Sequence, residues 1–266
     1  MPRLDVLIAD RGLAESRARA QALIMAGRVT VEGSVVTKAG TAVAPDADVL
    51  VAQPPRYVSR GGDKLETALR AFAIDPTGRR CLDVGASTGG FSDCLLQHGA
   101  ASVVAIDVGR AQLHQRIAID PRVTAIEGLN ARLLAPGDLP GEPAELAVLD
   151  VSFISLTLVL GPVIASLAPK WELAALVKPQ FEAGRELVAR GVVRDPEVQI
   201  ATCLRVAAAA SALGGKVVAC CDSQHPGPSG NREFFLHVRS AGSAPDRIEE
   251  VIRRAVEPDA GADHAS

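Results

Sequence analysis

The sequence predicts an α/β protein in which a small N-terminal α+β module precedes a mostly parallel sheet with helices on both faces. From about residue 78 onward, short apolar runs alternate with helical stretches, a pattern typical of parallel sheets that are covered on both sides. A glycine-rich turn follows the first apolar run directly, and Gln53-Pro54-Pro55 interrupts the chain before it. These observations separate two structural units and indicate the fold class of the larger one.

Residues 1–52 predict a compact unit of helices and short strands. Ser16 is a good N-cap, residues 18–25 are mostly good helix formers, and Gly27 is a good helix stop. Alternating apolar residues then predict short strands around a turn at Glu32-Gly33; they are Val29, Val31, Val35, Val36, Val49 and Val51.

The second unit is expected to contain a strand at each apolar run. In chain order these strands are predicted at residues 81–84, 103–107, 123–126, 146–150, 173–177, 217–220 and 234–238. Helices are predicted over residues 90–98 and 111–119, between the first three strands. The last two strands follow one another closely, so we expect them to pair antiparallel at one edge of the sheet.

The composition excludes a strongly basic nucleic-acid binder. Hydrophobic residues make up 48% of the 266 residues, enough for a well-buried core, and the formal net charge is −3. A broad positive field is therefore missing, and any contact with RNA requires local clusters of Arg and Lys.

No sequence feature predicts secretion, a membrane span or a metal site. The N-terminus has no charged-then-apolar signal layout, and no apolar run approaches the roughly 20 residues that span a bilayer. The five cysteines have no C-x-x-C spacing, and the five histidines are scattered. A cytoplasmic protein with reduced thiols is expected.

The glycine-rich turn at residues 83–91 predicts a binding site for an adenosine-type ligand. Its glycines let the backbone approach a ligand closely, at the carboxyl end of the first predicted strand. Asp107 follows Gly85 by about twenty residues, as expected for a carboxylate that binds ribose hydroxyls. The turn lacks the lysine of a phosphate-binding loop and departs from the G-x-G-x-x-G pattern of nicotinamide sites. A plain glycine-rich turn is the alternative.

Four polar stretches are candidates for chemistry, at residues 59–64, 149–153, 176–182 and 226–233. Asp150 and Lys178 directly follow apolar strands, so they should emerge at the carboxyl edge beside the glycine-rich turn. Since burying unpaired charges is costly, Asp150 and Lys178 are expected to pair with one another, so that Asp150 orients Lys178. Lys64 is expected to supply a second positive charge, and Glu233 to position either Lys64 or the ribose. Ordinary ion pairs at strand ends are the alternative for any one of them.

The stretches SRGGDKL, LDVGASTGGF, LDVSFISL, LVKPQFE and GPSGNREFF resemble the TlyA (hemolysin A) family of ribosomal RNA 2'-O-methyltransferases. The order Lys64, Asp150, Lys178, Glu233 resembles the Lys-Asp-Lys-Glu tetrad of FtsJ-like ribose 2'-O-methyltransferases. The resemblance covers nearly the whole chain. It implies a Rossmann-like class I methyltransferase with a seven-stranded sheet at residues 63–256. It also implies an N-terminal RNA-binding domain like that of small-subunit ribosomal protein four at residues 1–52, followed by a linker at 53–62. The Pro, Asp, Ala and Gly residues of 257–266 predict a flexible tail.

The resemblance also implies S-adenosylmethionine as cofactor and the 2'-hydroxyl of cytidine in ribosomal RNA as methyl acceptor. The residues implied for the methionine part are Gly85, Ser87, Thr88, Gly89 and Phe91, with Asp83, Ala86 and Gly90 beside them. Asp107 is then expected at the ribose and Asn130 near the adenine. Lys178 is the expected central group, either as a base or as a stabiliser of the alkoxide, and no metal is required.

Local positive charge for RNA is expected from Arg3, Arg17, Arg19, Arg28, Arg56 and Arg60, although a solvated helix face is the alternative for any one arginine. The expected partners are ribosomal RNA or ribosomal subunits. Three other functions remain as alternatives: a non-catalytic RNA-binding factor, a membrane-active hemolysin, and methylation of a base or a protein. The hemolysin would need a signal, a spanning segment or a strongly cationic amphipathic helix. The modified nucleotide and the oligomeric state stay open.

Overall fold

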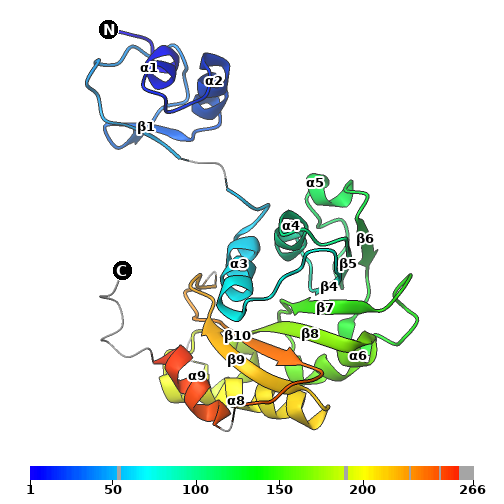
Figure 1. The fold of residues 1–266 in the computed structure, drawn as a ribbon. Coiled ribbons are helices and arrows are strands. Elements are labelled where there is room, and N and C mark those ends of the chain that lie inside the picture. The colour runs from blue at the N-terminus through cyan, green and yellow to red at the C-terminus, as the bar shows by residue number, and fades with distance from the viewer. Residues whose placement is uncertain (53–54, 189–190, 228, 246, 258–266) are drawn as a thin grey trace. The chain divides into compact units, whose positions relative to one another are not determined.

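The computed structural model describes residues 1–52, 55–188, 191–227, 229–245 and 247–257 (Figure 1). The chain divides into two compact units, residues 1–56 and residues 57–266. The division falls after Arg56, close to the Pro-rich break in the sequence. Residues 53, 54 and 258–266, from the predicted linker and tail, lie outside the described residues.

The first unit packs two helices against a small antiparallel sheet. The helices are α1 (Leu4–Asp10) and α2 (Arg17–Met25), and the strands β1 (Val29–Val31), β2 (Ser34–Val35) and β3 (Val49–Val51) lie in the order β2-β1-β3. Ser16 caps α2 as predicted, because its side chain accepts a hydrogen bond from the backbone N–H of Arg19. Leu4, Ile8 and Ile24 are fully buried and form the centre of the core.

The second unit is built on a sheet whose described strands lie in the order β6-β5-β4-β7-β8-β10-β9. The strands are β4 (Arg80–Val84), β5 (Ser102–Asp107), β6 (Val123–Glu127), β7 (Ala144–Leu149), β8 (Leu167–Val177), β9 (Lys216–Asp222) and β10 (Phe234–Arg239). The pairs from β6 to β8 are parallel, whereas β10 is antiparallel to both β8 and β9. The seven-stranded, mostly parallel sheet is therefore confirmed.

The last two strands pair antiparallel as predicted, but the final strand lies inside the sheet. β10 inserts between β8 and β9, so β9 forms the edge. Phe234, the first residue of β10, lies opposite Val177, the last residue of β8. The start of β10 thus reaches the same edge of the sheet as the ends of the parallel strands.

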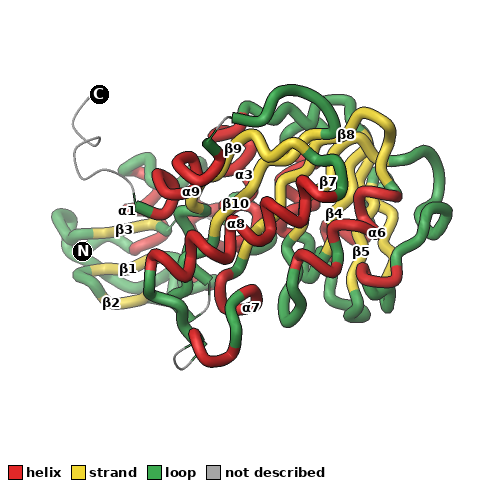
Figure 2. The backbone as a smooth tube through the Cα atoms, turned by 90° about the horizontal axis from the view of Figure 1, so that it is seen from below, coloured by secondary structure: helices red, strands yellow, loops and turns green. Residues whose placement is uncertain are grey.

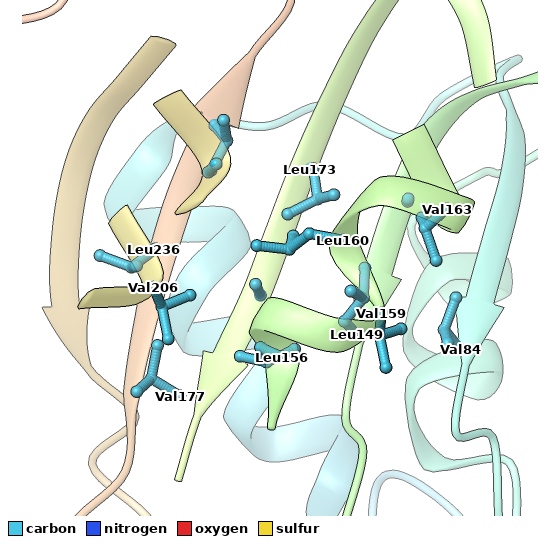
Figure 3. Close-up of a cluster of buried hydrophobic side chains, with 14 of the residues drawn as sticks. Val84, Leu149, Leu156, Val159, Leu160, Val163, Leu173, Val177, Val206 and Leu236 are labelled. Carbon is cyan, nitrogen blue, oxygen red and sulfur yellow. The ribbon is translucent and has the colours of Figure 1, made fainter. Parts of the chain in front are cut away.

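Helices cover both faces of this sheet, as Figure 2 shows for α8 (Pro196–Ala212) and α6 (Leu160–Ala165) on one face. These helices, the short helix η2 (Leu156–Leu158) and α9 (Ile248–Val256) pack on buried side chains such as Val84, Leu149 and Leu173 (Figure 3). On the opposite face, α3 (Arg60–Phe72), α4 (Gly90–Gln97) and α5 (Gln115–Ala118) pack on Val103 and Leu146. No described helix is long and apolar enough to cross a membrane.

Two local predictions differ from the structure. The helix predicted over residues 111–119 begins only at Gln115. Ala111 has a positive φ of 53° that a right-handed helix excludes, and His114, with a non-helical ψ of 138°, caps the helix by accepting a hydrogen bond from Arg116 N. Residues 57–62, predicted within the linker, instead pack with the second unit. Tyr57 is buried against Gly62, where a side chain would collide with its ring, and α3 already begins at Arg60.

Candidate active site

Several chain segments meet at the carboxyl edge of the sheet in the second unit. Gly85, Asp150 and Lys178 directly follow β4, β7 and β8, as the sequence predicted. Glu233 directly precedes β10, whose reversed direction brings its start to this edge. Lys64 comes from the first turns of α3, the helix that packs on α4. The topology therefore brings all four predicted catalytic residues to one place.

The four residues form two ion pairs. The Nζ atom of Lys178 lies 2.6 Å from Oδ1 of Asp150, and Nζ of Lys64 lies 2.6 Å from Oε2 of Glu233. The lysine side chains are only 11% and 10% exposed, and that of Glu233 is 1% exposed. Pairing compensates the cost of removing these charges from water. Each lysine is thus held at a fixed point with its ammonium largely shielded from solvent.

Two polar neighbours that the sequence did not single out complete these pairs. Lys178 Nζ donates a hydrogen bond of 2.7 Å to Ser152 Oγ, and Gln180 Nε2 donates one of 3.3 Å to Glu233 Oε1. Both residues lie within the predicted polar stretches, two residues after Asp150 and Lys178. Their positions in these stretches were the only indication in the sequence that Ser152 and Gln180 belong to the site. The fold shows which atoms the two side chains bind.

A cavity of about 340 Å³ opens beside the first ion pair. Its volume lies within the range of small-molecule sites. Asp107 lines it at the end of β5, and its carboxylate is held by the backbone N–H groups of Ser87 at 2.8 Å and Gly109 at 2.6 Å. The rest of the wall is largely apolar and includes Ile106, Val108, Leu129, Ala131, Val151 and Ile154.

A second cavity, of about 270 Å³, contains both ion pairs. Gly85, Ser87, Asp150 and Ser152 line both cavities, so the two are adjoining compartments of one site. The predicted loop residues that line the second cavity are Gly85, Ala86, Ser87, Thr88, Gly90 and Phe91. A ligand in the first compartment can therefore present a reactive group to one bound between the lysines.

Gly85 stands where the compartments meet, and its position tolerates no side chain. Its φ is +84°, in the left-handed region that favours glycine, and it accepts this conformation at no steric cost. A Cβ there would lie 2.5 Å from the backbone oxygen of Asp150. The close approach of these two backbone segments thus requires glycine and fixes Asp150 relative to the loop.

Two predicted cofactor residues do not line either compartment. Asp83 is fully buried on β4, where its Oδ2 accepts a hydrogen bond of 2.7 Å from Ser92 Oγ on α4. Burial raises the pKa of Asp83 to about 7, and the nearby Asp150 carboxylate adds to this rise. Gly89 faces Leu113 and Ile117 instead of the cavity. Both residues therefore support the loop from behind, whereas Asn130 does line the first compartment.

An exposed aromatic side chain stands at the rim of the site, and the sequence had not assigned it a role. Phe153 lines the first compartment, is 90% exposed and has a φ of +64°, which is strained for a residue other than glycine. Its ring centroid lies 5.0 Å from that of Phe181 on α7 (Pro179–Glu182). Buried Glu182 accepts hydrogen bonds from Ser155 Oγ and Leu156 N, which ties α7 to the segment after Phe153.

The six arginines predicted to contact RNA have different surroundings. Arg3 and Arg17 make ion pairs with Asp5 in the first unit, whereas Arg19, Arg28 and Arg56 are exposed. Arg60, on the second unit, is exposed at the start of α3 and lines the compartment that holds both lysines.

Comparisons with known proteins agree with both units. The model of FtsJ-like methyltransferases matches residues 57–240, and the model of the S4 domain matches residues 2–49. The chain is 44% identical to the 16S/23S rRNA (cytidine-2'-O)-methyltransferase TlyA of Mycobacterium tuberculosis, over 96% of this chain and 97% of that protein. It is 39% identical to Hemolysin A of Brachyspira hyodysenteriae, over 88% of this chain and 98% of that one.

A solved structure from Streptococcus thermophilus, named "Putative hemolysin", has the same fold. It is 39% identical, covers 95% of this chain and 94% of its own, and superposes with a TM-score of 0.73. The likeness thus extends over both units of the chain.

Proposed function

The chain belongs to the TlyA family of FtsJ-like methyltransferases, and from this membership we propose that it transfers a methyl group from S-adenosylmethionine to the ribose 2'-hydroxyl of cytidine in ribosomal RNA. The observation that carries this proposal is the pair of shielded lysines, each held by a carboxylate, in the compartment next to the nucleoside-sized cavity. Such a compartment suits a neutral hydroxyl that must lose its proton during the reaction.

The first compartment fits a nucleoside that carries no phosphate. The carboxylates of Asp107 and Asp150 line it and would repel a phosphate group. Asp107 keeps acceptor capacity for two ribose hydroxyls while Ser87 and Gly109 hold it in place, and apolar residues such as Leu129 would pack on the adenine. S-adenosylmethionine, when bound, supplies a methyl group on a positively charged sulfur, a strong electrophile.

Lys178 is the residue that would hold the acceptor oxygen. A lysine ammonium has three N–H donors; here Nζ donates a hydrogen bond to Ser152 Oγ and lies 2.6 Å from the Asp150 carboxylate, with which it forms an ion pair. A further N–H would hold the 2'-oxygen and stabilise the negative charge that grows on it as its proton leaves. This arrangement supports the alkoxide-stabilising role over the base role. Lys64, held by Glu233, adds a second positive charge in the same compartment.

Asp107 provides the first test of the cofactor site. We expect Asp107→Asn to weaken binding of S-adenosylmethionine about tenfold, because an asparagine amide cannot accept from two N–H groups and also bind ribose hydroxyls. Calorimetric titration measures the effect. Glu127→Gln is the matched control, since Glu127 ends the neighbouring strand β6 and accepts from Ala111 N outside the cavity. Equal affinity in both variants would remove Asp107 from the cofactor site.

Phe153 and Phe181 would provide a stacking surface for a base at the rim of the site. Enzymes that act within structured RNA take the target nucleotide out of its stack, and aromatic rings then support the exposed base. The strained backbone and 90% exposure of Phe153 are costs that such a role explains.

We expect Phe153→Ala to raise the KM for RNA about tenfold, because loss of one base stack costs roughly 1–3 kcal/mol. Phe153→Tyr should keep most of the activity because its ring is retained. Ile119→Ala, which shortens another exposed apolar side chain, is the control. Steady-state methylation assays with varied RNA separate KM from kcat, and an unchanged KM in Phe153→Ala would exclude the stacking role.

The S4 domain and the ribosomal RNA activity named for the Mycobacterium tuberculosis relative support ribosomal RNA as the substrate class. This substrate would also place the enzyme in the cytoplasm. The decisive experiment incubates the protein with labelled S-adenosylmethionine and each purified ribosomal subunit, followed by mass spectrometry of the RNA. We expect label on a cytidine ribose. Label on a base, label on protein, or no transfer to either subunit would refute the proposal.

A further inference from the structure

A buried carboxylate of the first unit binds two arginines whose side chains are about half exposed. Asp5, on α1, is 0% exposed and binds two arginines. Arg3 donates from Nε at 3.0 Å and from Nη2 at 3.1 Å, and Arg17 donates from Nε at 3.0 Å. Gln21, one turn after Arg17 on α2, donates from Nε2 at 2.6 Å. All four bonds converge on one side chain.

The arginines reach Asp5 with only part of their donors. The Arg3 and Arg17 side chains remain 51% and 54% exposed. An arginine has five N–H donors, and the hydrogen bond from Arg17 to Asp5 uses only the one on Nε. The guanidinium of Arg3 also lies close to Gly40, where a Cβ would stand 3.2 Å from Nη1. Each guanidinium is thus anchored on Asp5 by part of its N–H donors, while about half of the side chain stays exposed to solvent.

The arginines keep Asp5 charged just beneath the surface of the first unit. Asp5 is covered by side chains that are themselves about half exposed, and it does not belong to the apolar core of the unit. The hydrogen bonds from Arg3, and then those from Gln21 and Arg17, hold the pKa of the Asp5 carboxyl well below its usual range, so it stays charged at neutral pH. Arg11 differs from Arg3 and Arg17, because its side chain binds no carboxylate but donates to the backbone carbonyls of Pro45 and Ala47.

We propose that Asp5 is a positioning residue that holds Arg3 and Arg17 as one preorganised clamp for a phosphate of the RNA backbone, an inference that rests on the ribosomal RNA substrate proposed above. Two arginines and one carboxylate leave a net positive charge, and the planar fork of a guanidinium can donate to two oxygens of a phosphate at once. Because Asp5 fixes the side chains before RNA arrives, less conformational entropy is lost on binding.

The direction in which Asp5→Asn changes the affinity for RNA distinguishes a positioning role from an effect of net charge alone. Asp5→Asn removes a negative charge from an RNA-binding surface, so a surface that acts only through net charge would bind RNA more tightly. A clamp that needs the carboxylate would bind RNA more weakly, because the freed arginines must be ordered on binding. Asp10→Asn is the matched control, since Asp10 is exposed at the end of the same helix.

The experiment measures binding of the full-length protein to purified large and small ribosomal subunits over a range of salt concentrations. We expect Asp5→Asn to weaken binding about tenfold, the loss of one charge-assisted contact. Asp10→Asn should bind equally or slightly more tightly. In methylation assays KM for the subunit should rise while kcat and the affinity for S-adenosylmethionine, which the second unit binds, stay unchanged.

A second variant decides the case if Asp5→Asn unfolds the first unit in thermal melting. Arg17→Lys keeps the charge at an exposed position, but its single Nζ cannot bind Asp5 and a phosphate in the forked geometry of arginine. We expect severalfold weaker binding from Arg17→Lys alone. Where Asp5→Asn does fold, adding it to Arg17→Lys should cause little further loss of RNA binding. Unchanged or tighter binding in Asp5→Asn, or unchanged binding in Arg17→Lys, would overturn the clamp. Failure of the wild-type protein to bind or methylate either subunit would instead overturn the proposed function.

Discussion

Lys178→Ala is expected to lower the rate of methyl transfer at least about 100-fold, the usual effect of removing a group that stabilises a developing oxyanion or moves a proton. In this site the loss has a specific origin. Asp150 and Ser152 hold Nζ of Lys178 in the compartment, where it can donate to the substrate oxygen. Alanine removes this donor and leaves the Asp150 carboxylate without its cation. Affinity for S-adenosylmethionine should change much less, so single-turnover rates with saturating cofactor are the appropriate measurement.

A second substitution distinguishes the two possible roles of Lys178. Arginine stays protonated in proteins, so Lys178→Arg cannot act as a base but can still hold an anion. Measurable residual activity in Lys178→Arg above that of Lys178→Ala supports the alkoxide-stabilising role. Lys170→Ala is the control, because Lys170 is exposed near the other end of β8. Near-normal turnover of Lys178→Ala would remove this residue from the mechanism.

Gly85→Ala should weaken cofactor binding by about tenfold to 100-fold, since overpacking a tight site costs roughly 1–3 kcal/mol. It should also slow methyl transfer. The added Cβ would stand 2.5 Å from the backbone oxygen of Asp150, and neither backbone segment has a flexible end that can move aside. Separation of the two segments widens the cofactor loop and shifts the carboxylate that orients Lys178. Isothermal titration with S-adenosylmethionine and single-turnover rates measure the two effects.

The chain offers a matched control for the backbone strain in this variant. Gly78 has a φ of +71°, close to the +84° of Gly85, but a Cβ there would meet no atom within 4 Å. Gly78→Ala therefore carries a similar left-handed strain, about 1 kcal/mol, without the collision. If both variants lose cofactor affinity equally, strain and not the close approach to Asp150 is the cause.

Local sequence patterns were sufficient for the general architecture and for the composition of the candidate site. Apolar runs of strand length identified every described strand of the second unit, most directly the inner strands β4, β5, β7, β8 and β10, which are largely buried within the sheet. The same runs located Asp150 and Lys178, since residues that follow parallel strands share one edge. Ser16 as the N-cap of α2 was predictable for a similar local reason. The substrate and the roles of single residues came from family resemblance.

The tertiary structure decided what depends on contacts between distant parts of the chain. Lys64 binds Glu233 across 169 residues, whereas the sequence left open whether Glu233 positions Lys64 or the ribose. Asp83 has the sequence position of a ligand-binding residue, yet its side chain points to Ser92 behind the loop. In the sequence, Phe153 is an ordinary apolar residue. In the structure its backbone has a positive φ and its side chain is exposed.

The sequence by itself therefore determined which elements form and which polar residues reach the carboxyl edge of the sheet. Hydrophobic periodicity and turn-forming residues determine secondary structure over a few residues, so they can be read from the amino-acid sequence. Only the fold decided which side chains pair, which are buried behind the site and which stand at its rim. Those outcomes depend on the insertion of β10 between β8 and β9 and on side-chain directions, which long-range packing sets.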